Sequence, residues 1–83
     1  MKRSRLTMAR QVDDETVILD LSSGRYFALN TVGTFIWDRL ENECSEEELV
    51  DAVVERFEID RVNAAKDAAE LIQQLYDRDL LER

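Results

Sequence analysis

The sequence has no proline and no histidine, and only two glycines and one cysteine among its 83 residues. Histidine is the commonest general base and metal ligand, so its absence argues against catalytic and metal centres of the usual kinds. The single cysteine, Cys44, cannot form an internal disulfide, and nothing indicates an oxidising compartment. Because Cys44 has no histidine to activate it, we interpret it as a structural thiol. We expect no enzyme activity, no bound metal and no cofactor.

Long hydrophobic runs are also missing. No apolar stretch approaches the ~20 residues of a membrane span, and no secretory signal follows the basic residues at the N-terminus. We therefore expect a cytoplasmic protein with no membrane partner. Positive charge is scarce, since 11 Lys and Arg residues face 19 Asp and Glu residues and give a net charge of -8. Nucleic-acid binding depends on Lys and Arg, so a basic or neutral peptide or protein is the expected partner.

The residues present predict one domain, residues 1–83, with a small antiparallel sheet in its first third. Alternating apolar residues predict an edge strand at residues 5–10 and a second strand at 16–21. A third strand follows "SSG", which we interpret as a three-residue hairpin loop with Gly24 at positive φ.

That loop length sets the predicted register of the hairpin. Leu19 would lie opposite Phe27 and Val17 opposite Leu29, and these four residues would face the core. Tyr26 and Ala28 would lie on the outer face near Ile18. An apolar patch formed by Tyr26 and Ile18 could dock a partner enzyme, or could simply be exposed surface.

Three N-cap residues predict three helices in the rest of the chain. The first helix follows Asn30 and ends at about Asn42, and the second begins at Ser45 with a capping box. The third follows Asp60 and extends to about Arg78, after which "LLER" could form a short closing strand. The apolar arc of the third helix spans about 180°, whereas one core needs only ~100°. This arc contains Val62, Ala64, Ala65, Ala68, Ala69, Leu71, Ile72, Leu75 and Tyr76.

The third strand is also too apolar for a strand with one face in water, because "YFAL" does not alternate. If this strand is an edge strand beside the last helix, the two form a groove with unpaired backbone groups on one wall. An extended peptide is the natural occupant of such a groove. The alternatives are that the chain's own first strand, or a second copy in a homodimer, covers the edge.

Three segments, "VILDLSSGRYFALNTVGTFIWDRLE", "SEEELVDAVVERFEID" and "DAAELIQQLYDRDLL", resemble the PqqD-like proteins. These are stand-alone recognition elements for ribosomally made, post-translationally modified peptides. The resemblance covers roughly residues 12 to 82. One departure is Asp79, where the family usually has a glycine after the last helix, which puts the geometry of that helix end in doubt.

The resemblance implies an α+β, winged-helix-like fold, with a three-stranded antiparallel sheet followed by three helices. It implies a non-enzymatic adaptor that binds the leader of a precursor peptide as an added antiparallel strand and delivers it to a processing enzyme. Carried over by position, the main-chain contacts fall on Arg25, Tyr26, Phe27, Ala28 and Leu29. The helix wall falls on Asp67, Ala68, Leu71, Ile72 and Leu75.

Several readings of these residues remain open. Leu71, Ile72 and Leu75 could be ordinary core, and Asp67 could be a solvated carboxylate. Among stand-alone members, the chain most resembles the recognition subunit of lasso peptide biosynthesis, whose partner is a cysteine protease that removes the leader. A radical-SAM modification system, as in pyrroloquinoline quinone synthesis, is the alternative setting. A winged-helix nucleic-acid-binding protein is a further alternative, which the acidic second helix and the mixed third helix disfavour.

Overall fold

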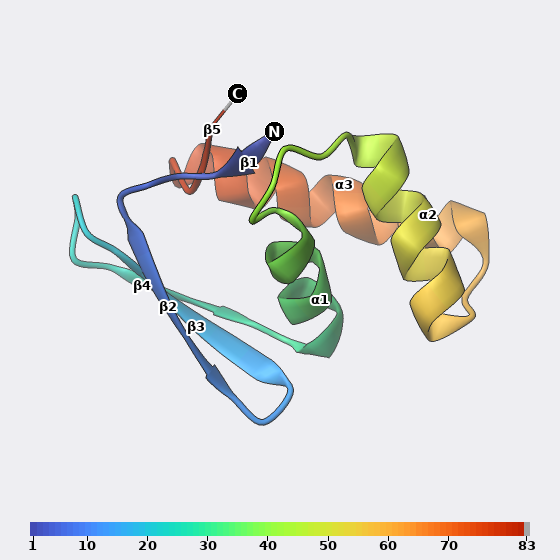
Figure 1. The fold of residues 1–83 in the computed structure, drawn as a ribbon, viewed down its shortest axis with the longest axis horizontal. Helices are drawn as coiled ribbons and strands as arrows, with labels where there is room; N and C mark the ends of the chain where they lie inside the picture. The colour runs from blue at the N-terminus through green and yellow to red at the C-terminus, as the bar shows by residue number, and fades with distance from the viewer. Residues whose placement is uncertain (83) are drawn as a thin grey trace.

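The computed structural model describes residues 1–82 and places the sheet before the helices, as the sequence predicts. The three-stranded antiparallel sheet has the order β2-β3-β4, with β2 at Thr7–Val12, β3 at Glu15–Asp20 and β4 at Tyr26–Leu29. The helices that follow are α1 at Thr31–Arg39, α2 at Glu46–Phe57 and α3 at Arg61–Asp77. Figure 1 shows the helices gathered on one side of the sheet. The expected α+β architecture, a three-stranded sheet followed by three helices, is confirmed.

Two further short strands join the ends of the described chain. β1 (Lys2–Arg3) pairs antiparallel with β5 (Leu81–Glu82), so the closing strand expected at "LLER" is present. Figure 1 shows β1 and β5 close together above the sheet. A bend at Arg5 and Leu6 separates β1 from β2, and the Ser4 hydroxyl stabilises it by accepting a hydrogen bond from the backbone N–H of Leu6 at 3.1 Å. The strand expected at residues 5–10 therefore begins two residues later, at Thr7.

The three predicted N-caps are all observed. Asn30 accepts from the backbone N–H of Gly33 at 2.9 Å, and Asp60 accepts from that of Asn63 at 2.8 Å. Ser45 and Glu48 form both hydrogen bonds of the capping box. Such caps satisfy backbone donors that the first helical turn leaves unpaired.

Helix α1 ends at Arg39 rather than near Asn42. The C-cap carbonyl of Leu40 accepts from the N–H of Arg3 at 3.0 Å. This long-range pairing with β1 takes the place of a further helical turn, and no local pattern in the sequence indicates it.

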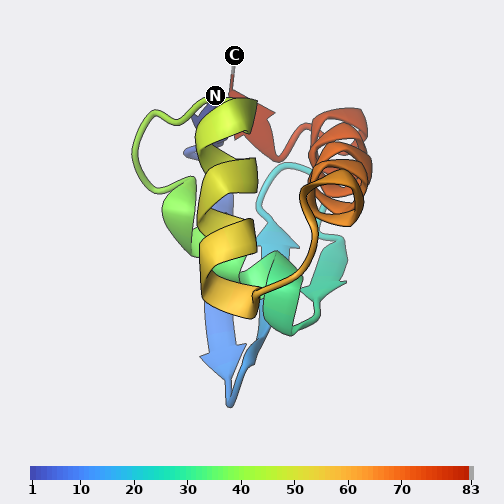
Figure 2. The same cartoon turned by 90° about the vertical axis from the view of Figure 1, so that its right-hand side faces the viewer.

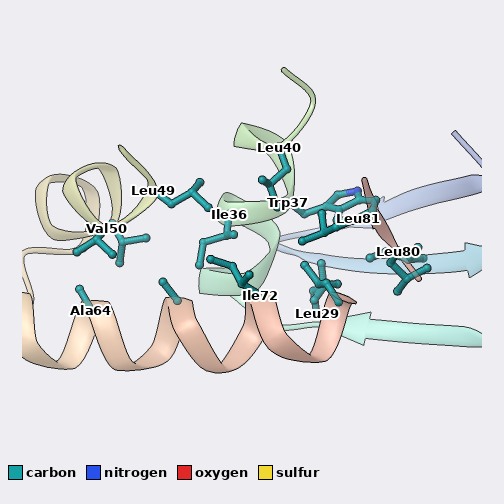
Figure 3. Close-up of a cluster of buried hydrophobic side chains, with 14 residues drawn as sticks. Leu29, Ile36, Trp37, Leu40, Leu49, Val50, Ala64, Ile72, Leu80 and Leu81 are labelled. Atoms are coloured by element: carbon teal, nitrogen blue, oxygen red, sulfur yellow. The ribbon is translucent and has the colours of Figure 1, made fainter. Parts of the chain in front are cut away.

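The core lies where α1 is enclosed by α2, α3 and the sheet. Figure 3 shows Ile36 and Trp37 of α1 pointing into the space between the other elements, with Leu49 entering from α2 and Ile72 from α3. Trp37 is the largest fully buried side chain among those described. The sheet is linked to α1 by a buried hydrogen bond, because the hydroxyl of Thr16 donates to that of Thr34 at 2.9 Å.

The hairpin register differs by one residue from the predicted one. Ile18 lies opposite Phe27 and Leu19 opposite Tyr26, because the loop contains four residues, Leu21 to Gly24, rather than three. The carboxylate of Asp20 stabilises this longer loop by accepting from the N–H and hydroxyl of Ser22 and the hydroxyl of Ser23. Gly24 has a φ of 75°, so the expected positive φ is confirmed.

A one-residue slip moves every side chain of a strand to the opposite face. The core face of β3 therefore carries Thr16 and Ile18, and the prediction that Val17 and Leu19 face the core is wrong. Ile18 is fully buried and forms no outer patch with Tyr26. On β4 the predicted faces are correct: Phe27 and Leu29 lie toward the core, and Tyr26 and Ala28 are exposed on the outer face.

Candidate functional site

The outer edge of β4 is free within residues 1–82. β2 and β4 are the two edges of the three-stranded sheet, and β1 pairs with β5 instead of with β4. The alternative in which the chain's own first strand covers this edge is therefore wrong. Figure 2 shows β4 on the same side of the molecule as α3, and residues of both elements line a common cavity.

The hydrogen-bond pattern of the hairpin shows which backbone groups this edge exposes. The N–H of Asp20 donates to the carbonyl of Arg25 at 2.9 Å, which makes these two residues a hydrogen-bonded pair. Hydrogen-bonded and non-hydrogen-bonded pairs alternate along an antiparallel ladder. With the observed register, the backbone groups of Phe27 and Leu29 therefore point toward β3. Those of Tyr26 and Ala28 point outward and lack a strand partner.

A cavity of about 360 Å³ separates this edge from helix α3. Most of its lining residues are apolar, and among residues 1–82 the only charged ones in the lining are Asp67 and Glu70, both on α3. We call it the acidic cavity. It is lined by Phe27, Ala28, Leu29, Asn30, Val32, Gly33, Ile36, Asp67, Glu70, Leu71 and Gln74.

A second cavity, of about 300 Å³, lies at the other end of β4. It is lined by residues of the hairpin loop, the start of β4 and the end of α3, and we call it the arginine cavity because Arg25 and Arg78 belong to it. Phe27 lines both cavities. Between them, the guanidinium of Arg78 stacks over the Phe27 ring, 4.6 Å from its centroid.

Three aspartates also line the arginine cavity, Asp20, Asp77 and Asp79. The hydroxyls of Ser22 and Ser23, together with the Ser22 N–H, hold the pKa of Asp20 below that of an ordinary aspartate. Asp77 accepts from the side-chain amide of Gln73 at 2.9 Å. The carboxylates of Asp20 and Asp77 are thus already engaged by neighbouring donors.

The structure brings most of the predicted site residues to these two cavities. Five of the ten predicted residues line the acidic cavity: Phe27, Ala28, Leu29, Asp67 and Leu71. Arg25 and Tyr26 line the arginine cavity, together with Phe27. Ala68, Ile72 and Leu75 lie elsewhere, buried in the core below α3, and line neither cavity.

The sequence reasoning missed two residues of the helix wall, Glu70 and Gln74. They follow Asp67 by three and seven positions, which places all three on one side of a helix. That spacing is visible in the sequence and could have identified them. The doubt raised by Asp79 is also answered, because this residue adopts a φ of 57° and ends the helix region without a glycine. Aspartate is among the residues that tolerate this left-handed conformation.

Neither a metal site nor an activated thiol is present among residues 1–82. No group of three or more metal-ligating side chains occurs there. Burial and the charge of Glu48 raise the pKa of the Cys44 thiol, which disfavours the nucleophilic thiolate. No helix in this part of the chain is long and apolar enough to span a bilayer.

Comparison with known proteins identifies the family. TbiB1 in complex with the TbiA(beta) leader peptide is 38% identical to this chain, with a TM-score of 0.90, and the match covers 99% of this chain and 95% of that one. Lasso peptide synthetase B1 complexed with the leader peptide is 26% identical, with a TM-score of 0.84 and coverage of 99% and 96%. No curated protein matches the chain. The family model of coenzyme PQQ synthesis protein D (PqqD) matches residues 15–81, and the chain therefore belongs to the PqqD family.

Proposed function

We propose that this protein is a non-enzymatic adaptor that binds the leader of a ribosomally made precursor peptide. The observation that carries the proposal is the free edge of β4 beside two cavities that share Phe27. A free strand edge binds an extended peptide by main-chain hydrogen bonds, and flanking pockets receive its alternate side chains. Two similar structures contain bound leader peptides, which supports the same class of ligand here.

The leader pairs with β4 as an antiparallel fourth strand. Its main chain bonds to the outward N–H and C=O groups of Tyr26 and Ala28, the two residues of β4 that β3 leaves unpaired. The helix wall is formed by Asp67, Glu70, Leu71 and Gln74, since these α3 residues line the acidic cavity. The other predicted wall residues, Ala68, Ile72 and Leu75, are buried in the core and support the groove from below.

The adaptor delivers the leader to a processing enzyme, and the setting we favour is lasso peptide biosynthesis with a separate leader-removing cysteine protease. The similarity to lasso peptide synthetase B1 supports this setting. The description of the matching family model favours a second candidate, a peptide chaperone for a radical-SAM enzyme of the PQQ type. A pull-down with each enzyme from the neighbouring genes separates the two.

A fluorescence-polarisation titration tests the adaptor function. The probe is a fluorescein-labelled leader from the neighbouring precursor gene, with a labelled DNA duplex measured beside it. Leu71→Asp should abolish leader binding, because it places a charge on the apolar part of the helix wall of the acidic cavity. Val62→Asp is the matched control, since Val62 lies on the same helix but is 80% exposed outside both cavities.

The two variants make the outcome decisive once circular dichroism shows that both are folded. Binding lost in Leu71→Asp and kept in Val62→Asp supports the groove, whereas equal binding by both contradicts it. Binding of DNA but not leader would favour the nucleic-acid alternative. If leader binding is absent and light scattering gives the mass of a dimer, a second copy covers the β4 edge and the adaptor proposal is wrong.

A further inference from the structure

The alternation of a β-ladder determines which side chains of a bound leader face α3. This step rests on the proposed function, the pairing of the leader with β4. Directly opposite residues of an antiparallel pair project to the same face. Leader residues opposite Leu29, Phe27 and Arg25 therefore project toward α3, whereas those opposite Ala28 and Tyr26 project to the outer face of the sheet.

The two cavities match the first and last of these three positions. Leu29 lines only the acidic cavity, and Arg25 lines only the arginine cavity. A leader residue i opposite Leu29 thus enters the acidic cavity, and residue i+4 enters the arginine cavity. Residue i+2 lies over Phe27 and the guanidinium stacked on it. At about 3.3 Å per residue, i and i+4 are roughly 13 Å apart.

The lining of the acidic cavity suits one kind of side chain. Leu29, Val32 and Leu71 offer an apolar surface, and Asp67 and Glu70 are exposed carboxylates on the helix wall. Ion pairs in residues 1–82 join the N-terminus to Glu43 and Arg61 to Asp51, so neither of these two carboxylates has a cationic partner there. Lysine and arginine place an aliphatic stem on apolar surface and keep the charge at the rim.

The arginine cavity offers a basic side chain less than the acidic cavity does. Among residues 1–82, Arg25 and Arg78 are the only cations that line either cavity, and both line this one. Asp20, Asp77 and Asp79 line it as well, but Asp20 accepts from Ser22 and Ser23, and Asp77 accepts from Gln73. A second basic side chain would meet two guanidiniums there, and like charges in apposition disfavour binding. The described groove therefore has carboxylates without a cation at the Leu29 end and charges of both signs at the Arg25 end.

We propose that Asp67 and Glu70 bind one lysine or arginine of the leader, and that this contact sets the position and direction of the peptide in the groove. In the antiparallel arrangement, the basic residue lies four positions N-terminal to the residue in the arginine cavity. Asp67 and Glu70 are thus specificity-determining residues, and the ligand class is an extended peptide with a basic residue at position i.

The test is a double-mutant cycle by fluorescence polarisation. The probe is the labelled leader of the neighbouring precursor gene, together with variants in which each lysine or arginine is replaced in turn by norleucine, which keeps the stem and removes the charge. The protein variants are wild type and Asp67→Asn/Glu70→Gln. Glu41→Gln/Glu55→Gln is the control, because it removes the same net charge at exposed residues that line neither cavity.

One norleucine replacement should weaken binding to wild type about three- to tenfold, the range of partly exposed charge pairs. Asp67→Asn/Glu70→Gln should bind the unmodified leader more weakly than wild type does, by the same factor. This variant should bind the norleucine peptide and the unmodified leader with equal affinity. A leader in which the basic residue is moved to position i+4 should bind wild type more weakly than the unmodified leader.

The inference is overturned if Asp67→Asn/Glu70→Gln binds the leader like wild type, or if it loses no more leader affinity than the Glu41→Gln/Glu55→Gln control. It is also overturned if the affinity lost by the protein variant and the affinity lost by the norleucine peptide are additive. In each of these cases the adaptor function survives, provided that Leu71→Asp still abolishes binding. If wild type itself does not bind the leader, the proposed function fails first and this inference fails with it.

Discussion

The guanidinium of Arg78 lies 4.6 Å from the centroid of the Phe27 ring and joins the end of helix α3 to strand β4. Phe27 lines both cavities and Arg78 lines only the arginine cavity, so this contact lies at the residue that the two cavities share. A cation held over an aromatic face at an exposed site contributes about 0.5–1 kcal/mol. The same residue is the C-cap of α3, where a positive charge interacts favourably with the helix dipole.

Replacing Arg78 should therefore weaken both folding and peptide binding. We expect Arg78→Ala to lower the free energy of unfolding by about 1 kcal/mol, measured by urea denaturation. Leader affinity should fall in parallel, because the groove loses its central stack. Arg56→Ala is the matched control, since Arg56 stacks over Phe57 at 5.1 Å but lies outside both cavities. Equal losses of leader affinity in the two variants would contradict a special role for Arg78.

Ala28→Pro tests the direction of the backbone groups on β4. Proline removes one N–H, and here that N–H points away from β3. We expect the fold to be kept and leader affinity to fall at least about threefold, the value of one hydrogen bond. Phe27→Pro is the contrasting variant, because its N–H faces β3 and its loss should lower the melting temperature. A folded Ala28→Pro protein with unchanged affinity would show that the peptide does not pair at this residue.

The buried hydroxyl pair of Thr16 and Thr34 should behave as a unit. Both residues are 3% exposed, and their hydroxyl oxygens are 2.9 Å apart. Thr16→Val leaves the Thr34 hydroxyl buried without its partner, which should cost about 1–3 kcal/mol of unfolding free energy. In Thr16→Val/Thr34→Val both polar groups are gone, and stability should return close to wild type. Additive losses in urea denaturation would show that the hydroxyls do not act together.

The carboxylate of Asp20 should make the hairpin loop sensitive to acid. Its pKa is lowered in the folded state by the hydroxyls of Ser22 and Ser23 and by the Ser22 N–H. A depressed folded pKa contributes stability above the pKa of an unfolded aspartate, and that contribution is lost as the pH falls through the folded value. The stability difference between wild type and Asp20→Asn should therefore shrink in acid.

An NMR titration of the Asp20 carboxyl checks the cause of this shift directly. In Ser22→Ala/Ser23→Ala the pKa should rise toward that of an ordinary aspartate, because two of the donors are gone. If the pKa of Asp20 does not move in this variant, the serine hydroxyls are not the cause.

Local signals predicted much of the fold. Asn30, Ser45 and Asp60 cap the three helices as their chemistry requires, and Gly24 adopts the positive φ expected of a loop glycine. Local signals could not predict the register of the hairpin, because loops of three and four residues both fit this sequence. The deciding contacts are hydrogen bonds from Ser22 and Ser23 to Asp20, which form only once the loop has closed.

The candidate site, like the fold, could be predicted from the sequence only in part. The apolar strand and the wide apolar arc of the last helix predicted a groove, and the structure places Phe27 and Leu71 on opposite walls of one cavity. The helical period alone could not separate Leu71, which is half-buried at the cavity, from Leu75, which is fully buried in the core. That distinction depends on how α3 is rotated against the sheet, and tertiary packing sets this rotation.

The pairing of β1 with β5 has a consequence for how the chain folds. Lys2 lies opposite Glu82 and Arg3 opposite Leu81, so these contacts have nearly the greatest sequence separation the chain allows. Contacts of such high order form late, because closing a long loop costs entropy before any pairing offsets it. During synthesis, β1 has no partner strand until helix α3 and the residues after it have been made, although Arg3 can already contact Trp37 and Leu40. The β2–β3–β4 hairpins are local in sequence and can form early, so the edge that we propose binds the leader can exist before the two ends of the chain have paired.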